Sequence, residues 1–231
     1  MFVLFCAFFA QYGMLARVLL RKACVDTFHK TCDELDKADM HEASARAALV
    51  SSYVLSSSGL LSILSTSWLA AASDVIGRRI VLAGSAAFMF VSSIGTFCVV
   101  LLGWSSWTLI PFYAVGGLGG SFTSFNAAAF AFTADVTSEP ARPSRFSVLE
   151  SFIFLGGVAG STSGAQLLRL SDSAPFAATS ALYLAIVFYV PCVMAETVPG
   201  ASWRRLREVS WWGTLRGLLA VDSSRRSHGR V

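Results

Sequence analysis

A short charged segment, residues 74–79 with the sequence DVIGRR, separates two long uncharged stretches of the chain. Its glycine permits a tight turn, its carboxylate can meet a helix end or a basic side chain, and its guanidinium groups can bridge to carboxylates on neighbouring helices. A second charged connection follows the next uncharged stretch. Together the two connections supply seven candidates for a charge cluster: Asp74, Gly77, Arg78, Arg79, Asp135, Arg142 and Arg145. Asp135 can pair with Arg78 or Arg145, and such pairs can exchange as a gate opens, or they can be ordinary charges at helix ends that fix topology.

Glu150 is the one acid that follows the apolar pattern of a long segment rather than a connection. It lies five residues beyond Arg145, which at ~1.5 Å per residue places it about 7–8 Å along a helix, at an inner vestibule rather than at the bilayer centre. Burial there would raise the affinity of the carboxylate for a proton, as a proton-coupling group requires. An interfacial acid paired with Arg145 or Arg142 explains the position equally well.

Long uncharged runs must position these residues, and four of them cover residues 47–73, 80–134, 151–168 and 173–195. A segment crosses a membrane as a helix of ~20 apolar residues. We therefore expect an all-α membrane protein with six spans, over residues 1–20, 47–73, 80–102, 107–134, 145–168 and 174–195. The longest run folds back at residues 103–106, and residues 21–46 form a polar extracellular or lumenal loop.

The composition leads to the same class of protein, since 55% hydrophobic residues, 14% charged residues and a mean hydropathy of +0.62 do not describe a water-soluble surface. It excludes a disordered chain, a disulfide-stapled secreted module and a nucleic-acid binder. The net charge of +4 is typical of basic residues that flank spans. All three histidines lie outside the expected spans, and no HExxH, GxSxG or phosphate-binding loop occurs, so we expect no enzyme, no metal site and no cofactor.

Glycines recur at helical spacing in two of the expected spans. Gly116 and Gly120 are one i, i+4 step apart, and Gly156, Gly160 and Gly164 make two such steps. This spacing lets helix backbones approach closely, and in transporters it also allows helices to slide or rock. We assign these glycines to helix packing.

The segment at residues 67–79 resembles the signature loop of the major facilitator superfamily, a small-residue helix end followed by D-x-x-G-R-R that faces the cytoplasm in that family. Four further features look like the solute-carrier group that contains the proton-coupled folate transporter. They are GGLGG at 116–120, AFTADVT at 131–137, Arg142 and Arg145 followed by Leu149-Glu150, and Glu196-Thr197. The resemblance extends to about residue 196. It corresponds to the first half of a twelve-span transporter, whose two six-helix bundles enclose the substrate path.

This resemblance implies proton-coupled symport of an organic anion such as a folate-like compound, with Glu150 in proton coupling. The first and fourth helices line the central cavity in that family, which gives four candidate substrate contacts: Gln11, Tyr12, Asn126 and Phe130. Interhelical hydrogen bonds are the alternative for the polar ones. Because the second bundle is missing, we expect transport only with a second half or as a homodimer. The alternative is a truncated, non-transporting membrane protein that acts as an interaction module.

The chain is expected to divide into a bundle over residues 1–196 and a basic cytoplasmic tail over 197–231, which is partly amphipathic and disordered at its end. The expected partners are the lipid bilayer, a small-molecule solute and protons. The expected location is multi-pass in the plasma membrane or an endosomal or lysosomal membrane. Cys24 and Cys32 can pair with each other if the loop faces an oxidising lumen, while the family resemblance also allows a bridge to the absent second half.

Overall fold

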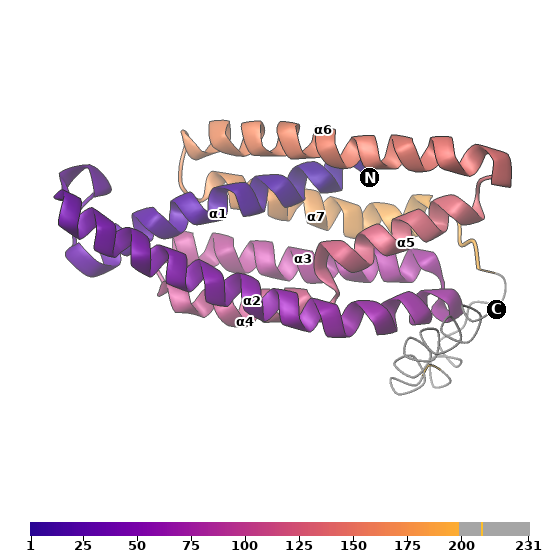
Figure 1. The fold of residues 1–231 in the computed structure, drawn as a ribbon, viewed down its shortest axis with the longest axis horizontal. Helices are drawn as coiled ribbons and strands as arrows, with labels where there is room; N and C mark the ends of the chain where they lie inside the picture. Colours follow the sequence, from indigo (N-terminus) through magenta and orange to yellow (C-terminus); the bar gives the residue numbers. More distant parts are fainter. Residues whose placement is uncertain (199–208, 210–231) are drawn as a thin grey trace, which may run out of the picture.

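The computed structural model describes residues 1–198 and Val209, apart from the side chain of Asp33, and this part of the chain is built from helices. Within it, seven α-helices run roughly along the long axis of the molecule (Figure 1). They are α1 (Phe2–Phe28), α2 (Lys37–Ile76), α3 (Arg78–Leu101), α4 (Leu109–Leu118), α5 (Ser121–Asp135), α6 (Arg142–Leu168) and α7 (Ala174–Val193). Short 3-10 helices lie in the connections: η1 (Cys32–Glu34), η2 (Ser106–Thr108) and η3 (Glu139–Ala141). Most of the expected basic tail lies outside the described residues.

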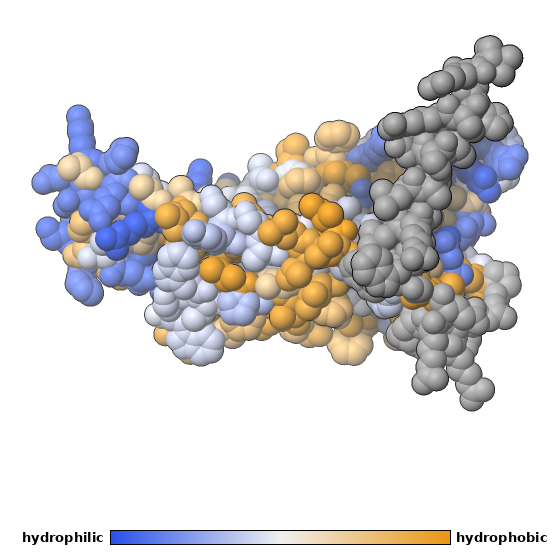
Figure 2. Space-filling model, turned by 60° about the horizontal axis from the view of Figure 1, so that its bottom comes forward, coloured by the Kyte–Doolittle hydropathy of each residue, from blue (hydrophilic) through white to orange (hydrophobic). Residues whose placement is uncertain are grey.

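Five of these helices, α1, α2, α3, α6 and α7, are long and apolar enough to cross a membrane. The shorter α4 and α5 follow one another along the bundle and together supply a sixth crossing (Figure 1). Hydrophilic residues gather at the two ends of the molecule, and the surface between them is mostly apolar or weakly polar (Figure 2). The expected six-span, all-α bundle is therefore confirmed for the described part of the chain.

The fourth span, expected as one helix, is broken at Gly119 and Gly120. Gly120 has a φ of 71°, a left-handed conformation that interrupts an α-helix and that glycine adopts without strain. Serines of α2 bind the carbonyl oxygens at the break, because Ser62 Oγ donates to the Gly120 oxygen at 2.8 Å and Ser65 Oγ to the Gly117 oxygen at 2.9 Å. An irregular backbone inside a membrane requires such partners. Gly120 thus lies in a turn that is packed against α2, and not within a helix.

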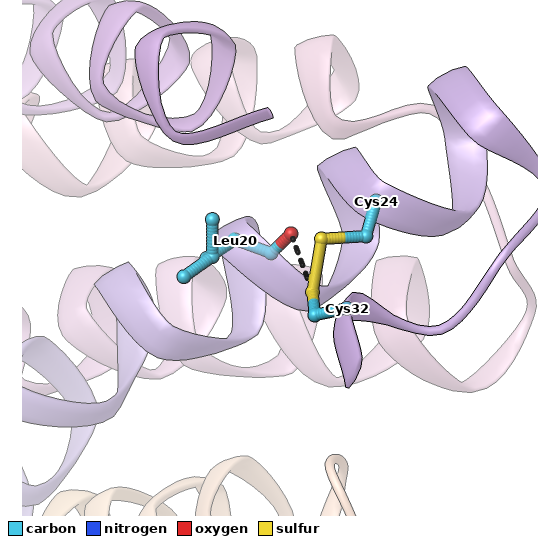
Figure 3. The surroundings of a disulfide bond; sticks show 3 residues. All are labelled: Leu20, Cys24 and Cys32. Atoms are coloured by element: carbon cyan, nitrogen blue, oxygen red, sulfur yellow. Dashed lines mark hydrogen bonds between the residues drawn. A yellow bond between two sulfur atoms is a disulfide. The ribbon is translucent and has the colours of Figure 1, made fainter. Parts of the chain in front are cut away.

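Residues 21–46, expected as a loop, are largely helical, because α1 continues to Phe28 and α2 begins at Lys37. The two helices extend past the rest of the bundle at one end (Figure 1). A disulfide between Cys24 and Cys32, whose Cα atoms are 5.5 Å apart, fastens the connection to the last turns of α1 (Figure 3). Of the two pairings left open by the sequence, the structure contains the one within this connection.

Close backbone contact sets the position of α6 against α1. A Cβ on Gly160 would overlap the carbonyl oxygen of Cys6, and a Cβ on Gly164 would lie 3.3 Å from Ala10. Gly156 likewise meets the backbone of α1. Gly116 on α4 contacts Ser92 of α3, where a Cβ would lie 3.2 Å from the serine Cβ. These glycines lie where helices touch, and they fix the orientation of α6, the helix that carries Glu150.

Candidate functional site

The connection between α2 and α3 is the single residue Gly77, whose φ of 106° and ψ of 146° are rarely adopted by residues with a side chain. This sharp turn brings Asp74, in the last turn of α2, beside Arg78, the first residue of α3, with Nη1 and Oδ1 2.5 Å apart. Arg78 also reaches α5, where its Nε lies 3.2 Å from Oδ2 of Asp135. One guanidinium group therefore joins three helices. Solvent weakens the pair with Asp74, which is 62% exposed, more than the pair with Asp135, which is 33% exposed.

The end of α7 closes this cluster from the other side through Glu196. Its Oε1 accepts the backbone N–H of Arg78 at 3.0 Å and those of Thr197 and Val198 at 3.0 and 3.2 Å. Its carboxylate lies against Gly77, where any Cβ would overlap it. Beside it, Arg79 Nη1 donates to the carbonyl oxygen of Met194 at 3.4 Å.

From the sequence, Glu196 contributed only to the family resemblance and was not among the residues expected in the charge cluster, although it directly follows the last long uncharged run. Thr197 adds to the same junction, because its Oγ1 donates to Oδ2 of Asp135 at 3.1 Å. The carboxylate of Asp135 is thus shared between α3 and the residues that follow α7.

The two other arginines of the expected cluster have different surroundings. Arg142 donates from Nε to the carbonyl oxygens of Ala134 and Thr137, at 3.2 and 3.3 Å, so it supports the connection that leads into α6. Arg145 is exposed and makes no ion pair with any described residue. Of the two partners considered for Asp135, the structure brings Arg78 into contact and leaves Arg145 apart.

Glu150 is exposed on α6, on the stripe that also contains Gly157 and Ser161, seven and eleven residues further along. These two residues border α1, because a Cβ on Gly157 would lie 3.7 Å from the ring of Phe9 and a Cβ on Gly13 would lie 3.6 Å from Ser161 Oγ. Glu150 therefore lies on the edge of α6 that faces the exposed side of α1. Within the described residues, it makes no ion pair with Arg145 or Arg142.

Gln11, expected at the cavity wall, is completely buried. Its Nε2 donates to the hydroxyl of Tyr113 on α4 at 3.2 Å and, more weakly, to Ser92 Oγ on α3 at 3.5 Å. This is the interhelical hydrogen bonding that the sequence left as the alternative reading. As placed, Gln11 joins three helices inside the bundle and does not present its amide to a solute.

Tyr12 on α1 and Asn126 and Phe130 on α5 are half-buried. The ring of Tyr12 contacts Phe8 with centroids 4.4 Å apart, and Phe130 contacts Phe146 of α6 at 5.4 Å. The Oδ1 atom of Asn126 is enclosed and has no hydrogen-bond partner among the described residues. Of the four expected substrate contacts, Tyr12, Asn126 and Phe130 are thus partly exposed, although the amide oxygen of Asn126 is enclosed.

A bundle of six crossings, with a charged junction at one end and polar groups on an exposed helical wall, defines a multi-pass integral membrane protein with the architecture of a transporter half. Comparison with known families agrees: the family model of the Major Facilitator Superfamily matches residues 1–221. The chain belongs to this superfamily. The resemblance drawn from the loop at residues 74–79 is thereby confirmed.

Among curated proteins, the chain is similar to the proton-coupled folate transporter of Rattus norvegicus, with 30% identity over 160 residues. The aligned stretch covers 69% of this chain and 35% of the rat protein. The chain thus spans about a third of the length of that relative, on the side of the first bundle. The family points to a transporter rather than an enzyme.

Proposed function

We propose that this chain forms one wall of a solute transporter that couples uptake of an organic anion to protons. Glu150 is the observation that carries the proposal. A carboxylate exposed on a membrane-spanning helix is unfavourable against lipid, and it normally faces a cavity or another helix bundle. Its exposure makes it available to a proton and a solute.

The charged junction supports the same function. Arg78 and Glu196 connect the ends of α2, α3, α5 and α7 through bonds that are partly exposed to water. Such contacts can separate and re-form at a modest free-energy difference, as alternation between two states of a transporter requires. We propose that this junction acts as a gate on the cytoplasmic side.

The proposal is tested with the purified chain in proteoliposomes, by measuring uptake of a labelled folate-like anion driven by a pH gradient. Uptake is expected only where the chain is dimeric or is joined by a second half, since each bundle supplies one wall. Glu150→Gln should abolish the dependence on the gradient but retain solute exchange at equal pH. The matched control is Glu139→Gln, an acid with an 88% exposed side chain in the connection before α6.

Proton-driven uptake that persists in Glu150→Gln would overturn the coupling role, and robust uptake by a demonstrated monomer would overturn the half-wall arrangement. The alternative function, an interaction module, is favoured by the low burial of α2 and α6. The α6 glycines cannot serve it, because they already contact α1. A partner would therefore bind the exposed stripe of α2 around Gly59, where a Cβ would meet no atom within 4 Å. Crosslinking in native membranes to an unrelated subunit, in place of a second half, would select this function.

A further inference from the structure

A groove of about 340 Å³ lies between the start of α1 and the last turns of α7. Its walls include Val3 and Leu4 of α1, Phe125 of α5, and Ile186, Val190 and Met194 of α7. It is open to the surface, since Val3 is 47% exposed and Tyr189, which also lines it, is 57% exposed. The groove is apolar and runs beside helices that cross the membrane, so it offers the surroundings of a hydrocarbon chain.

A positive charge lies at one end of this groove. Met194, which lines it, accepts the long hydrogen bond from Arg79 Nη1 described above. A guanidinium group has five N–H donors, so this contact leaves most of the donors of Arg79 available. The nearby acids are engaged elsewhere: Asp74 and Asp135 pair with Arg78, and Glu196 accepts backbone N–H groups. Arg79 forms no ion pair with a described acid.

We propose that the groove and Arg79 together form a binding site for one anionic phospholipid. Its acyl chain lies between α1 and α7, and its phosphate meets the guanidinium group of Arg79. Basic residues between spans at the cytoplasmic face bind anionic headgroups in membrane proteins, and here the apolar groove and the charge share one residue, Met194. The site does not depend on the proposed transport, since Glu150 takes no part in it.

The test uses the full chain in nanodiscs that contain a trace of photoactivatable lipid with the reactive group on its acyl chain. Phosphatidylglycerol and phosphatidylcholine probes are compared, and the labelled peptides are mapped. Phosphatidylglycerol should label residues 1–4 and 185–194 about fivefold more than phosphatidylcholine does, the factor expected for one basic residue at an anionic headgroup. Arg79→Gln should remove this preference, whereas Arg169→Gln, at an exposed site beyond the other end of α6, should retain it.

A second variant tests the groove without touching the charge. Ala185→Phe places a ring in the groove, and Ala181→Phe places the same ring one turn away at an exposed position that does not line it. Labelling should fall severalfold only in Ala185→Phe. Equal labelling by the two lipids in the unmodified chain, or equal labelling in Ala185→Phe and Ala181→Phe, would overturn the site. Displacement of the lipid by excess glycerol phosphate would also overturn it, because it would show that the acyl chain contributes nothing.

Discussion

Glu196→Ala is expected to release the start of α3 from the end of α7. The carboxylate accepts three backbone N–H groups in the structure, and the one from Arg78 spans 118 residues of sequence. A hydrogen bond to a charged group contributes ~1.5–3 kcal/mol, and a helix N-cap bond ~1 kcal/mol. Because this junction is half-buried, we take ~1–2 kcal/mol for the bond to Arg78, which corresponds to about 5–30-fold more frequent local opening.

Hydrogen exchange of the purified chain, resolved to single amides by fragmentation, measures this opening directly. The amide of Arg78 should exchange about 5–30-fold faster in Glu196→Ala, while amides at the contact of α1 with α6 stay unchanged. Gly77→Ala should give the same result by a second route, because its Cβ would displace the carboxylate and its φ would be strained. The matched control is Glu139→Ala, which removes an exposed acid 3.9 Å from Arg142. If Arg78 exchanges within about twofold of that control in Glu196→Ala, the carboxylate does not hold the turn.

Two further predictions concern helix contact and the disulfide. Gly160→Ala should separate α1 from α6 and lower the melting temperature of the purified chain, because the new methyl group meets the backbone of Cys6. Gly157→Ala should be neutral or stabilising, because its methyl group would lie 3.7 Å from the ring of Phe9. Equal melting temperatures of the two variants would refute the close contact. In the denatured chain, where the otherwise buried Cys24 is accessible, a maleimide of high mass should label two more cysteines after reduction than before, and Cys32→Ser should leave Cys24 reactive without reduction. A Cys24 that stays protected in Cys32→Ser would show that it pairs elsewhere.

The number of spans and the charged turn were predictable from sequence, because both depend on local chemistry. Uncharged runs of sufficient length cross a membrane as helices whatever surrounds them. Gly77 and its neighbours lie within six residues of sequence, and their turn is fixed by a glycine with positive φ between two helix ends. The pairing of Asp135 with Arg78 was one of two options, and both partners lay on the expected side of the membrane.

The break at Gly119 and Gly120 could not be predicted in the same way. An uncharged stretch gives no polarity signal inside it, and a glycine pair ends a helix in a membrane only where other groups bind the freed carbonyl oxygens. Those groups include Ser62 and Ser65, more than fifty residues earlier on α2, and Ser85 on α3, which binds the oxygen of Gly119 at 3.0 Å. The burial of Gln11 has the same origin, since its partners come from two other helices. Interactions between distant helices decide such positions.

The exposed residues of α7 and those at the start of α6 differ in polarity, and this difference indicates what surrounds each of them. On α7, exposed positions such as Leu184 and Phe188 are apolar, as a lipid-facing surface requires. On α6, the exposed side carries Ser147, Glu150 and Ser151 near the start of the helix, where an ionised group is unfavourable against lipid, and Phe154, Leu155 and Val158 further along. We therefore expect the first turns of α6, and not its whole length, to face water or another helix bundle. Glu150 makes no ion pair within the described residues, so its substitution is the direct test of the proposed coupling.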